Sequence, residues 1–491
     1  MIIALDIGTS STRATLYDAA GSRVEGVRHQ VRCEPLTVAG GGVEHDPMRL
    51  LEAAVASIDA VLPRAGEVGG VGICTFWHGL LGFDARGRPS TPVYTWADTR
   101  SDRAVDDLRK RLDEDAVHDR TGCHLHSSYW PAKIRWYSAL SAASPVERWG
   151  SIGELLALEW FGEAATGVSM ASATGLFDQR ASRWDPELLE AAGIDERRLF
   201  PLRDRGEPWR RLREPWATRW PKLRDAAWFP AVGDGAASNI GCGCTGPGRI
   251  ALNVGTSAAM RVLSDDPPRR TPWGLWRYRV DRRLSVVGGA LSEGGNVYAW
   301  CLEILRLPAG PTLERELREA VERDHGLAVL PFLAGERSPG WRGRARAAIG
   351  GLSLGTTPIE ILHATLESVA LRLALVYERL APLASEKHEI IVSGGALSHS
   401  RVWAQMIADA LGQPLTLSSE SEASSRGVAL LALDSLGIPP GLAGARAPDG
   451  ERVEPDPMRR ERYAKAATRH GRLYDALVGP ARARRLSPGP G

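Results

Sequence analysis

The chain has 491 residues, of which 43% are hydrophobic and 24% are charged, and its formal net charge is only +2. This length suffices for two or more domains with cores of their own, and the nearly balanced charge gives no reason to expect a nucleic-acid or anionic-membrane partner. No stretch approaches the ~20 apolar residues that span a bilayer, and no basic segment precedes the first apolar run, so we expect a soluble cytoplasmic protein.

Six cysteines are scattered along the chain without a C-x-x-C pair: Cys33, Cys74, Cys123, Cys242, Cys244 and Cys301. A zinc site needs a second ligand pair that the sequence does not offer, and this density is too low for a disulfide framework. We expect reduced, buried thiols.

The first predicted element is a buried strand that ends on an acid. Residues 2–7 are apolar except for Asp6, and Gly8 then opens a turn of small and hydroxyl residues. Such a turn lets backbone N–H groups and hydroxyls approach a phosphate. The candidates are Thr9, Ser10, Ser11, Thr12 and Arg13. Asp6 is the candidate ligand of a nucleotide-bound Mg²⁺. The alternative is an edge hairpin with a polar turn and no ligand.

Further strands in the first half end on aromatic or polar residues. The expected elements are a helix at 47–62, strands at 68–75 and 92–96, a charged helix at 101–115 and a helical insertion with loops at 120–230. Trp77 and His78 follow the first of these strands, and Asp98 and Arg100 follow the second. Because α/β sheets place ligands beyond the carboxyl ends of their strands, Trp77 and His78 are candidate sugar contacts. Asp98 and Arg100 are further candidates for substrate binding. The alternatives are a core tryptophan, a satisfied loop histidine and an Asp98–Arg100 pair that braces its loop.

Asp234 is the candidate general base. It lies between Gly233 and Gly235, where a strand is expected to end and a helix to begin. A carboxylate on such a tight turn can accept a hydroxyl proton. The alternative is an ordinary N-cap of the following helix.

The second half restarts in the style of the first. A strand at 250–254 breaks into Gly255-Thr256-Ser257, and a strand at 259–263 follows, which makes a weak internal repeat. Two such turns could hold one triphosphate from two sides. Gly394 and Gly395 after a strand at 389–393 could let an adenine approach the backbone. The remaining elements expected are a strand at 285–289, helices at 291–305, 358–380, 402–411, 427–436 and 461–477, and a disordered end.

The order of these segments resembles the FGGY family of carbohydrate kinases from residue 1 to about 440. The segments are Asp6–Arg13, Trp96–Arg100, Gly233–Gly235, Asn253–Ser257, Gly335–Pro339 and Ser393–Leu397. The resemblance implies an α/β fold of two actin-like (ribonuclease H-like) domains flanking a nucleotide and sugar cleft, with ATP and Mg²⁺ as cofactors. It implies domains at 1–246 and 247–440, followed by a helix and tail at 441–491.

The same resemblance implies roles for individual residues. Asp234 matches the catalytic base and Asp6 the acid near the metal and phosphates, while Thr256 falls in the second phosphate loop and Gly395 in the adenosine motif. Trp77 and His78 match a sugar-binding pair. Trp77 departs from the usual methionine, and Ala396 replaces a further glycine.

The segments Trp96–Ser101 and Thr121–Lys133 look most like the gluconokinase branch, which makes gluconate the expected substrate. A sugar acid needs cations or N–H donors for its carboxylate, and the candidates are His78, Arg100, His126 and Lys133. The alternative for Lys133 is a solvated surface side chain. Xylulose, ribulose or another polyol stays open as substrate, as do an actin-like ATPase and a catalytically inactive sugar-binding regulator. The candidate protein partner is a second copy of the chain, in a homodimer.

Overall fold

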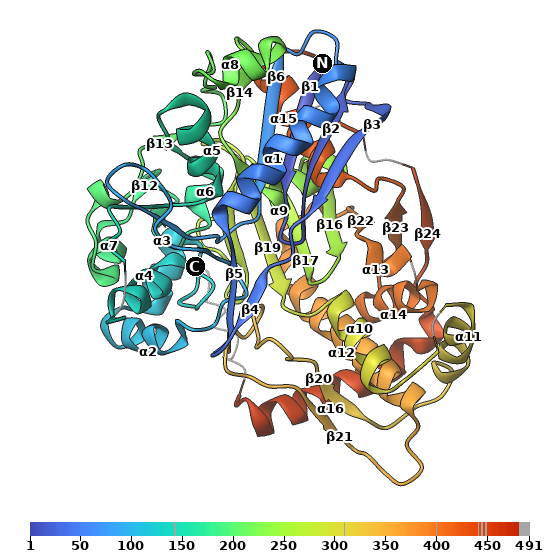
Figure 1. The fold of residues 1–491 in the computed structure, drawn as a ribbon. Helices are drawn as coiled ribbons and strands as arrows, with labels where there is room; N and C mark the ends of the chain where they lie inside the picture. Colours follow the sequence, from blue (N-terminus) through green and yellow to red (C-terminus); the bar gives the residue numbers. More distant parts are fainter. Residues whose placement is uncertain are drawn as a thin grey trace, which may run out of the picture.

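The computed structural model of this chain describes residues 1–141, 144–308, 310–398, 400–439, 441–442, 445–446 and 449–480. Its elements form two large mixed sheets, one in each half of the chain, with helices around them (Figure 1). The predicted disordered end lies at 481–491, outside the described residues.

The first sheet has six strands in the order β14-β6-β1-β2-β3, and β15 also pairs with β6. The strands are β1 (Ile2–Ile7), β2 (Ser11–Tyr17), β3 (Arg23–Arg32), β6 (Gly70–Thr75), β14 (Ala227–Trp228) and β15 (Val232–Gly233). β1 is antiparallel to β2 and parallel to β6. All six residues of β1 are buried, as the apolar run of the sequence predicts for a central strand.

The second sheet has seven strands in the order β18-β19-β17-β16-β22-β23-β24. They are β16 (Arg249–Val254), β17 (Ala258–Ser264), β18 (Trp276–Arg279), β19 (Ser285–Leu291), β22 (Glu389–Ser393), β23 (Leu415–Ser418) and β24 (Gly450–Val453). β16 is antiparallel to β17 and parallel to β22. The hairpin that opens each half therefore occupies the same place in its sheet, and the predicted internal repeat is confirmed at the level of topology.

Helices α1 (Pro47–Val61), α9 (Asp234–Gly241) and α15 (Ala423–Ser435) pack with the first sheet. Asp46 caps α1 by accepting from the N–H groups of Met48 and Arg49. α15 contacts α9, β1 and β6 although its residues fall within the predicted second domain, and Figure 1 shows it among the strands of the first half.

The second sheet packs against its own helices, of which α12 is the longest. The helices of this half are α10 (Gly295–Ile304), α11 (Pro311–Ala320), α12 (Pro358–Leu380), α13 (Gly395–Ser398), α14 (Arg401–Leu411) and α16 (Arg460–Leu477). α12 has the predicted bounds because Thr357 and Glu360 form a capping box at its start. The helix expected from residue 291 begins only at Gly295, since β19 continues to Leu291.

The helical insertion is confirmed and holds short strands as well (Figure 1). Its helices, with the two that precede it, are α2 (Asp102–Arg111), α3 (Glu114–Thr121), α4 (Trp130–Ser138), α5 (Ile152–Phe161), α6 (Val168–Ser172), α7 (Pro186–Ala192) and α8 (Trp216–Arg219). The charged helix expected at 101–115 is two helices, because Asp113 caps a new helix instead of continuing α2.

Small sheets complete the fold. They pair β4 (Leu36–Val38) with β5 (Gly42–His45) and β8 (Val93–Tyr94), β7 (Leu81–Phe83) with β9 (Arg148–Gly150), β10 (Thr166–Gly167) with β13 (Leu202–Arg203), β11 (Phe177–Asp178) with β12 (Arg183–Trp184), and β20 (Ala328–Leu330) with β21 (Ala348–Gly350). Among the described residues, none of the helices has the length and apolar character needed to cross a membrane.

Candidate active site

Three parallel strands of the first sheet end side by side, and their ends carry the predicted site residues. Ile7 of β1 pairs with Thr75 of β6, which in turn pairs with Gly233 of β15. This register brings the ends that carry Asp6, Trp77 and Asp234 to one edge of the sheet, as the sequence predicts. The nearby charge of Asp234 also raises the pKa of Asp6.

Asp6 is a buried carboxylate with two partners. Cys74 donates its thiol to Oδ1 over 3.3 Å, and Arg13 donates to Oδ2 over 3.4 Å. Burial raises the pKa of Asp6 to about 6, and the charge of Arg13 opposes this shift. A hard cation would bind the same oxygen atoms.

Asp234 is the first residue of α9, and its Oδ1 accepts from the N–H of Gly235 over 2.7 Å. The N-cap position belongs to Gly233, so the simple capping role considered for Asp234 is not observed. Burial raises the pKa of Asp234, and the charges of Arg261 and Arg337 oppose this shift. A carboxylate with a raised pKa is a better proton acceptor at neutral pH than an ordinary one.

Trp77 packs directly on the turn that carries Asp234. A Cβ atom at Gly233 would lie 1.9 Å from the Trp77 indole, and one at Gly235 would lie 2.4 Å from it. The indole Nε1 donates to the Ser169 carbonyl over 3.3 Å, and the ring meets Tyr278 edge-on at 4.9 Å. Both glycines are therefore required because the indole occupies the space a side chain would need. Trp77 supports Asp234, and its predicted contact with sugar stays a prediction.

His78 is held in a left-handed backbone conformation with φ +68°. Lys133 Nζ donates to its carbonyl over 3.2 Å, and its Nδ1 donates to the Ala173 carbonyl over 2.7 Å. The Nε2 atom is thus left as the acceptor of a neutral ring. Burial lowers the pKa of His78 well below its ordinary value, which fits this neutral form. A constrained, neutral acceptor is suited to a sugar hydroxyl and unsuited to a carboxylate.

Two other candidate cations are not available as free positive charges: Lys133 is already hydrogen-bonded to backbone carbonyls, and His126 is neutral. Lys133 is 1% exposed, donates to the carbonyls of His78 and Ser128, and has a pKa lowered to about 7 by burial, so the solvated alternative is wrong. Burial lowers the pKa of His126 to about 3. Its Nδ1 accepts from the Ser128 N–H, so its buried Nε2 is a donor without a partner among the described residues.

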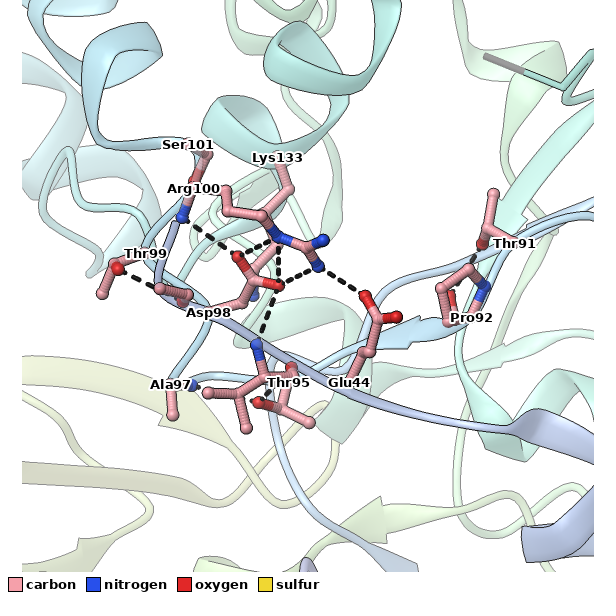
Figure 2. Close-up of polar contacts among 12 residues, drawn as sticks. Glu44, Thr91, Pro92, Thr95, Ala97, Asp98, Thr99, Arg100, Ser101 and Lys133 are labelled. Carbon is pink, nitrogen blue, oxygen red and sulfur yellow. Dashed lines mark hydrogen bonds and ion pairs between the residues drawn. The ribbon is translucent and has the colours of Figure 1, made fainter. Parts of the chain in front are cut away.

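Figure 2 shows Asp98 and Arg100 engaged with each other. Arg100 donates to both carboxylate oxygens of Asp98 and, over 2.6 Å, to Glu44. Asp98 also accepts from the N–H of Val43 over 3.3 Å. These contacts tie the loop after β8 to β5 and neutralise the charge of Arg100. This geometry matches the alternative in which Asp98 and Arg100 pair to brace their loop. Sugar binding by these two residues stays a prediction.

Sequence reasoning missed two arginines of the second half that face Asp234. Arg261 of β17 lies against the turn, since a Cβ atom at Gly235 would be 3.0 Å from its Nε. Arg337 stacks over Trp96, 5.3 Å from the ring centroid. Among the described residues, buried Nε and Nη1 of Arg261 and buried Nε of Arg337 have no hydrogen-bond partner. The sequence signal for Arg261 was a charged residue within the apolar strand expected at 259–263. Arg337 lies inside the segment Gly335–Pro339, one of the six that resemble the family.

In each half of the chain, the predicted phosphate turn has an exposed hydroxyl residue. Gly8 donates to the Ser11 carbonyl over 2.9 Å and leaves Ser10 exposed. In the second half, Gly255 donates to the Ser257 carbonyl over 3.0 Å, and Thr256 is exposed.

A third glycine turn lies beside the second one. Gly394 has φ +100°, and a Cβ atom there would lie 2.5 Å from the Val254 carbonyl oxygen, so only glycine fits. At Gly395 a Cβ atom would meet no atom within 4 Å. The backbone at Gly394–Gly395 thus lies next to the 254–257 turn and borders open space.

Comparisons with known proteins match nearly the whole chain. Residues 1–241 match the N-terminal domain of the FGGY family of carbohydrate kinases, and residues 250–435 match its C-terminal domain. Gluconokinase of Bacillus subtilis (strain 168) is 26% identical over 453 residues, with 89% of this chain and 88% of the relative covered. Glycerol kinase of Leptothrix cholodnii is 29% identical over 473 residues, with 90% and 92% covered.

The fold has counterparts among solved structures. A ligand-bound xylulose kinase from Lactobacillus acidophilus superposes with a TM-score of 0.88 at 24% identity, with 98% of this chain and 99% of that chain covered. Two domain matches in the expected order, relatives covered over most of their length and a shared fold agree with one another. This chain belongs to the FGGY family of carbohydrate kinases.

Proposed function

We propose that this kinase transfers the γ-phosphoryl group of ATP to a hydroxyl of a small sugar acid, and that gluconate is converted to 6-phosphogluconate. The observation that supports a sugar acid as the substrate is the pair of arginines Arg261 and Arg337. Both present buried guanidinium N–H groups beside Asp234 that have no hydrogen-bond partner among the described residues. Leaving such donors unpaired is costly, and a carboxylate satisfies them with strong charge-assisted bonds.

In this proposal the first sheet supplies the proton acceptor. Asp234 takes the proton of the attacking hydroxyl, and Trp77 holds the turn in place by filling the space above both glycines. Neutral His78 accepts a hydrogen bond from another sugar hydroxyl through Nε2. Recognition thus combines cationic groups from the second half with a base and a neutral acceptor from the first.

The donor set of the three glycine turns and Asp6 fits ATP with Mg²⁺. Hydroxyls of Thr9, Ser10, Ser11 and Thr256, the backbone of the turns at Gly255 and at Gly394–Gly395, and the Arg13 guanidinium are of the kinds that bind phosphate. The Asp6 carboxylate offers the oxygen ligand that Mg²⁺ prefers. When bound, the metal neutralises charge on the phosphates. Asp6 would hold it, and the turns would position the triphosphate.

The test is a kinase assay with gluconate, xylulose, ribulose and glycerol, each with ATP and Mg²⁺. We expect gluconate to have the highest kcat/KM. Asp234→Asn should lower kcat by about 10²–10⁴-fold and leave ATP affinity, measured by calorimetry, unchanged. The control is Asp195→Asn, a surface aspartate paired with Arg197. Turnover near that of the wild type in Asp234→Asn would overturn the assignment of the base.

Arg337→Gln separates the sugar acid from the other substrates. It removes a positive charge and keeps a planar polar group, so kcat/KM for gluconate should fall about tenfold or more while kcat/KM for glycerol changes little. An equal loss for both substrates would remove the argument for a carboxylate partner.

The second candidate function is a xylulokinase or another pentulose or polyol kinase. It is favoured by the neutral state of His78, which suits uncharged hydroxyls. In that case xylulose or glycerol leads the panel, and Arg337→Gln affects all substrates alike. The actin-like ATPase alternative predicts ATP hydrolysis that none of the four sugars changes.

A further inference from the structure

A pocket of about 550 Å³ lies where the helical insertion meets the edge strand β18 of the second sheet. Among the described residues, its lining includes five arginines, Arg180, Arg269, Arg270, Arg277 and Arg279, and one carboxylate, Asp119. The volume is that of a small-molecule site. None of these residues belongs to the proposed active site.

The carboxylate does not neutralise the pocket. Asp119 pairs with Arg180 at 2.9 Å and approaches Arg270 at 3.8 Å. Arg277 and Arg279 reach only backbone carbonyls: Arg277 donates to Pro268 over 2.8 Å and Arg279 to Arg282 over 2.7 Å. Within the described part of the chain, neither forms an ion pair.

Arg277 is the second, independent sign of a ligand. The residue is 4% exposed, and its Nε and Nη2 atoms are buried without a hydrogen-bond partner in the described residues. Burial and the like charges of Arg279 and Arg180 lower its pKa to about 10, so the group stays a cation at neutral pH. A buried, incompletely bonded cation is costly unless an anion completes its shell.

We propose that this arginine pocket binds a small phosphorylated metabolite, with the phosphate ester held by Arg277 and Arg279 and enclosed by Arg180 and Arg270. Guanidinium groups bind phosphate in two-pronged geometry, and the pocket has room for a sugar-sized group beside the phosphate.

Strand β18, which carries Arg277 and Arg279, also packs against the proposed active site. Side chains alternate along a strand, so Trp276 and Tyr278 face away from Arg277 and Arg279. Tyr278 lies 4.9 Å from the Trp77 ring and hydrogen-bonds Tyr129 over 2.7 Å. A ligand in the arginine pocket therefore bears on the strand whose opposite face supports Trp77 and, through it, Asp234.

The experiment is calorimetric titration of the full-length protein with 6-phosphogluconate, inorganic phosphate and gluconate as separate probes. Arg180→Gln/Arg270→Gln removes two pocket charges from exposed positions, so we expect the variant to fold. Arg197→Gln/Arg210→Gln is the matched control, because it removes the same charge from exposed sites elsewhere. Arg337→Gln reports binding of a probe in the active site.

We expect a 6-phosphogluconate site whose affinity falls about tenfold or more in the pocket variant and is unchanged in the control and in Arg337→Gln. Inorganic phosphate should compete for this site, and gluconate should not. Equal affinity in the pocket variant and the control would overturn the proposal, as would loss of all phosphate-ester binding in Arg337→Gln. Displacement of 6-phosphogluconate by gluconate would overturn the claim that the pocket recognises a phosphate group. None of these outcomes depends on which sugar the kinase phosphorylates.

Discussion

Asp234 combines a raised pKa with a cation that opposes the rise, and both follow from its surroundings. Burial disfavours its charged form, while Arg261 favours it. A general base works only when unprotonated, so kcat/KM falls as pH decreases through its pKa. The acidic limb of the pH profile should therefore lie above the range of an ordinary aspartate.

Replacing Arg261 should move that limb in a known direction. Arg261→Gln removes the largest effect that lowers the pKa of Asp234, so the acidic limb of kcat/KM should shift to higher pH. The measurement is kcat/KM against pH for the best substrate, with the distant surface variant Arg197→Gln as control. A shift to lower pH, or the same shift in the control, would contradict this account.

Single residues with a local signal could be predicted from the sequence, and those without one could not. Asp6 and Asp234 each lie next to a strand end with a glycine one or two residues further on, which is visible in a few letters. Arg261 and Arg337 reach the same place from β17 and from a loop about a hundred residues beyond Asp234. Their meeting depends on how the two sheets are placed, and no short segment encodes that. The pairing of Arg100 with Asp98 was an open alternative because Glu44, the other carboxylate that Arg100 contacts, lies 56 residues away in the sequence.

At the scale of elements, α9 and α15 cross with their backbones in contact. A Cβ atom at Gly427 would lie 1.7 Å from the Ala237 carbonyl oxygen, and one at Gly241 would lie 1.8 Å from that of Ala423. Neither clash is with a flexible side chain, so the helices must separate to admit even a methyl group. We expect Gly427→Ala to lower the free energy of unfolding by several kcal/mol, on the order of the costlier overpacking effects in cores.

Gly471 offers the matched control. It lies inside α16, and a Cβ atom there would meet no atom within 4 Å. Gly471→Ala should raise the free energy of unfolding by about 0.5–1 kcal/mol, since alanine is the better helix former. Urea unfolding followed by circular dichroism measures both. The same sign of change in both variants would show that the crossing does not govern the effect.

Most elements were predictable because their own residues specify them. The capping box and apolar spacing of α12 and the apolar run of β22 gave their exact bounds. Where the prediction was wrong, a neighbour decided: β19 extends to Leu291 because β17 pairs with it along that length. The place of α15 on the first sheet has no signature in its sequence, since its apolar surface would suit either sheet.

For the whole molecule, buried histidines link stability to pH. Burial lowers the pKa values of several of them, to about 4 for His118 and to about 3 for His126, His363 and His470. The unfolded chain takes up these protons near pH 6.5 and the folded chain does not. Stability is therefore complete above that pH and is lost as the pH falls below it, by at most about 1.4 kcal/mol per pH unit for each histidine.

His363→Leu tests one of the four. His363 is 0% exposed, and both of its ring nitrogens lack partners among the described residues. The variant should lose less stability than the wild type between pH 7.5 and 5.5, measured by urea unfolding at each pH. An unchanged loss would mean that His363 takes up its proton equally well in the folded state.

The position of α15 also sets the order in which the chain can mature during synthesis. The first sheet needs this helix to cover β1 and β6, yet residues 250–422, including most of the second sheet, leave the ribosome before it does. Until then the apolar inner face of the first half has no permanent cover. The first half therefore completes its fold only after most of the second half has been made.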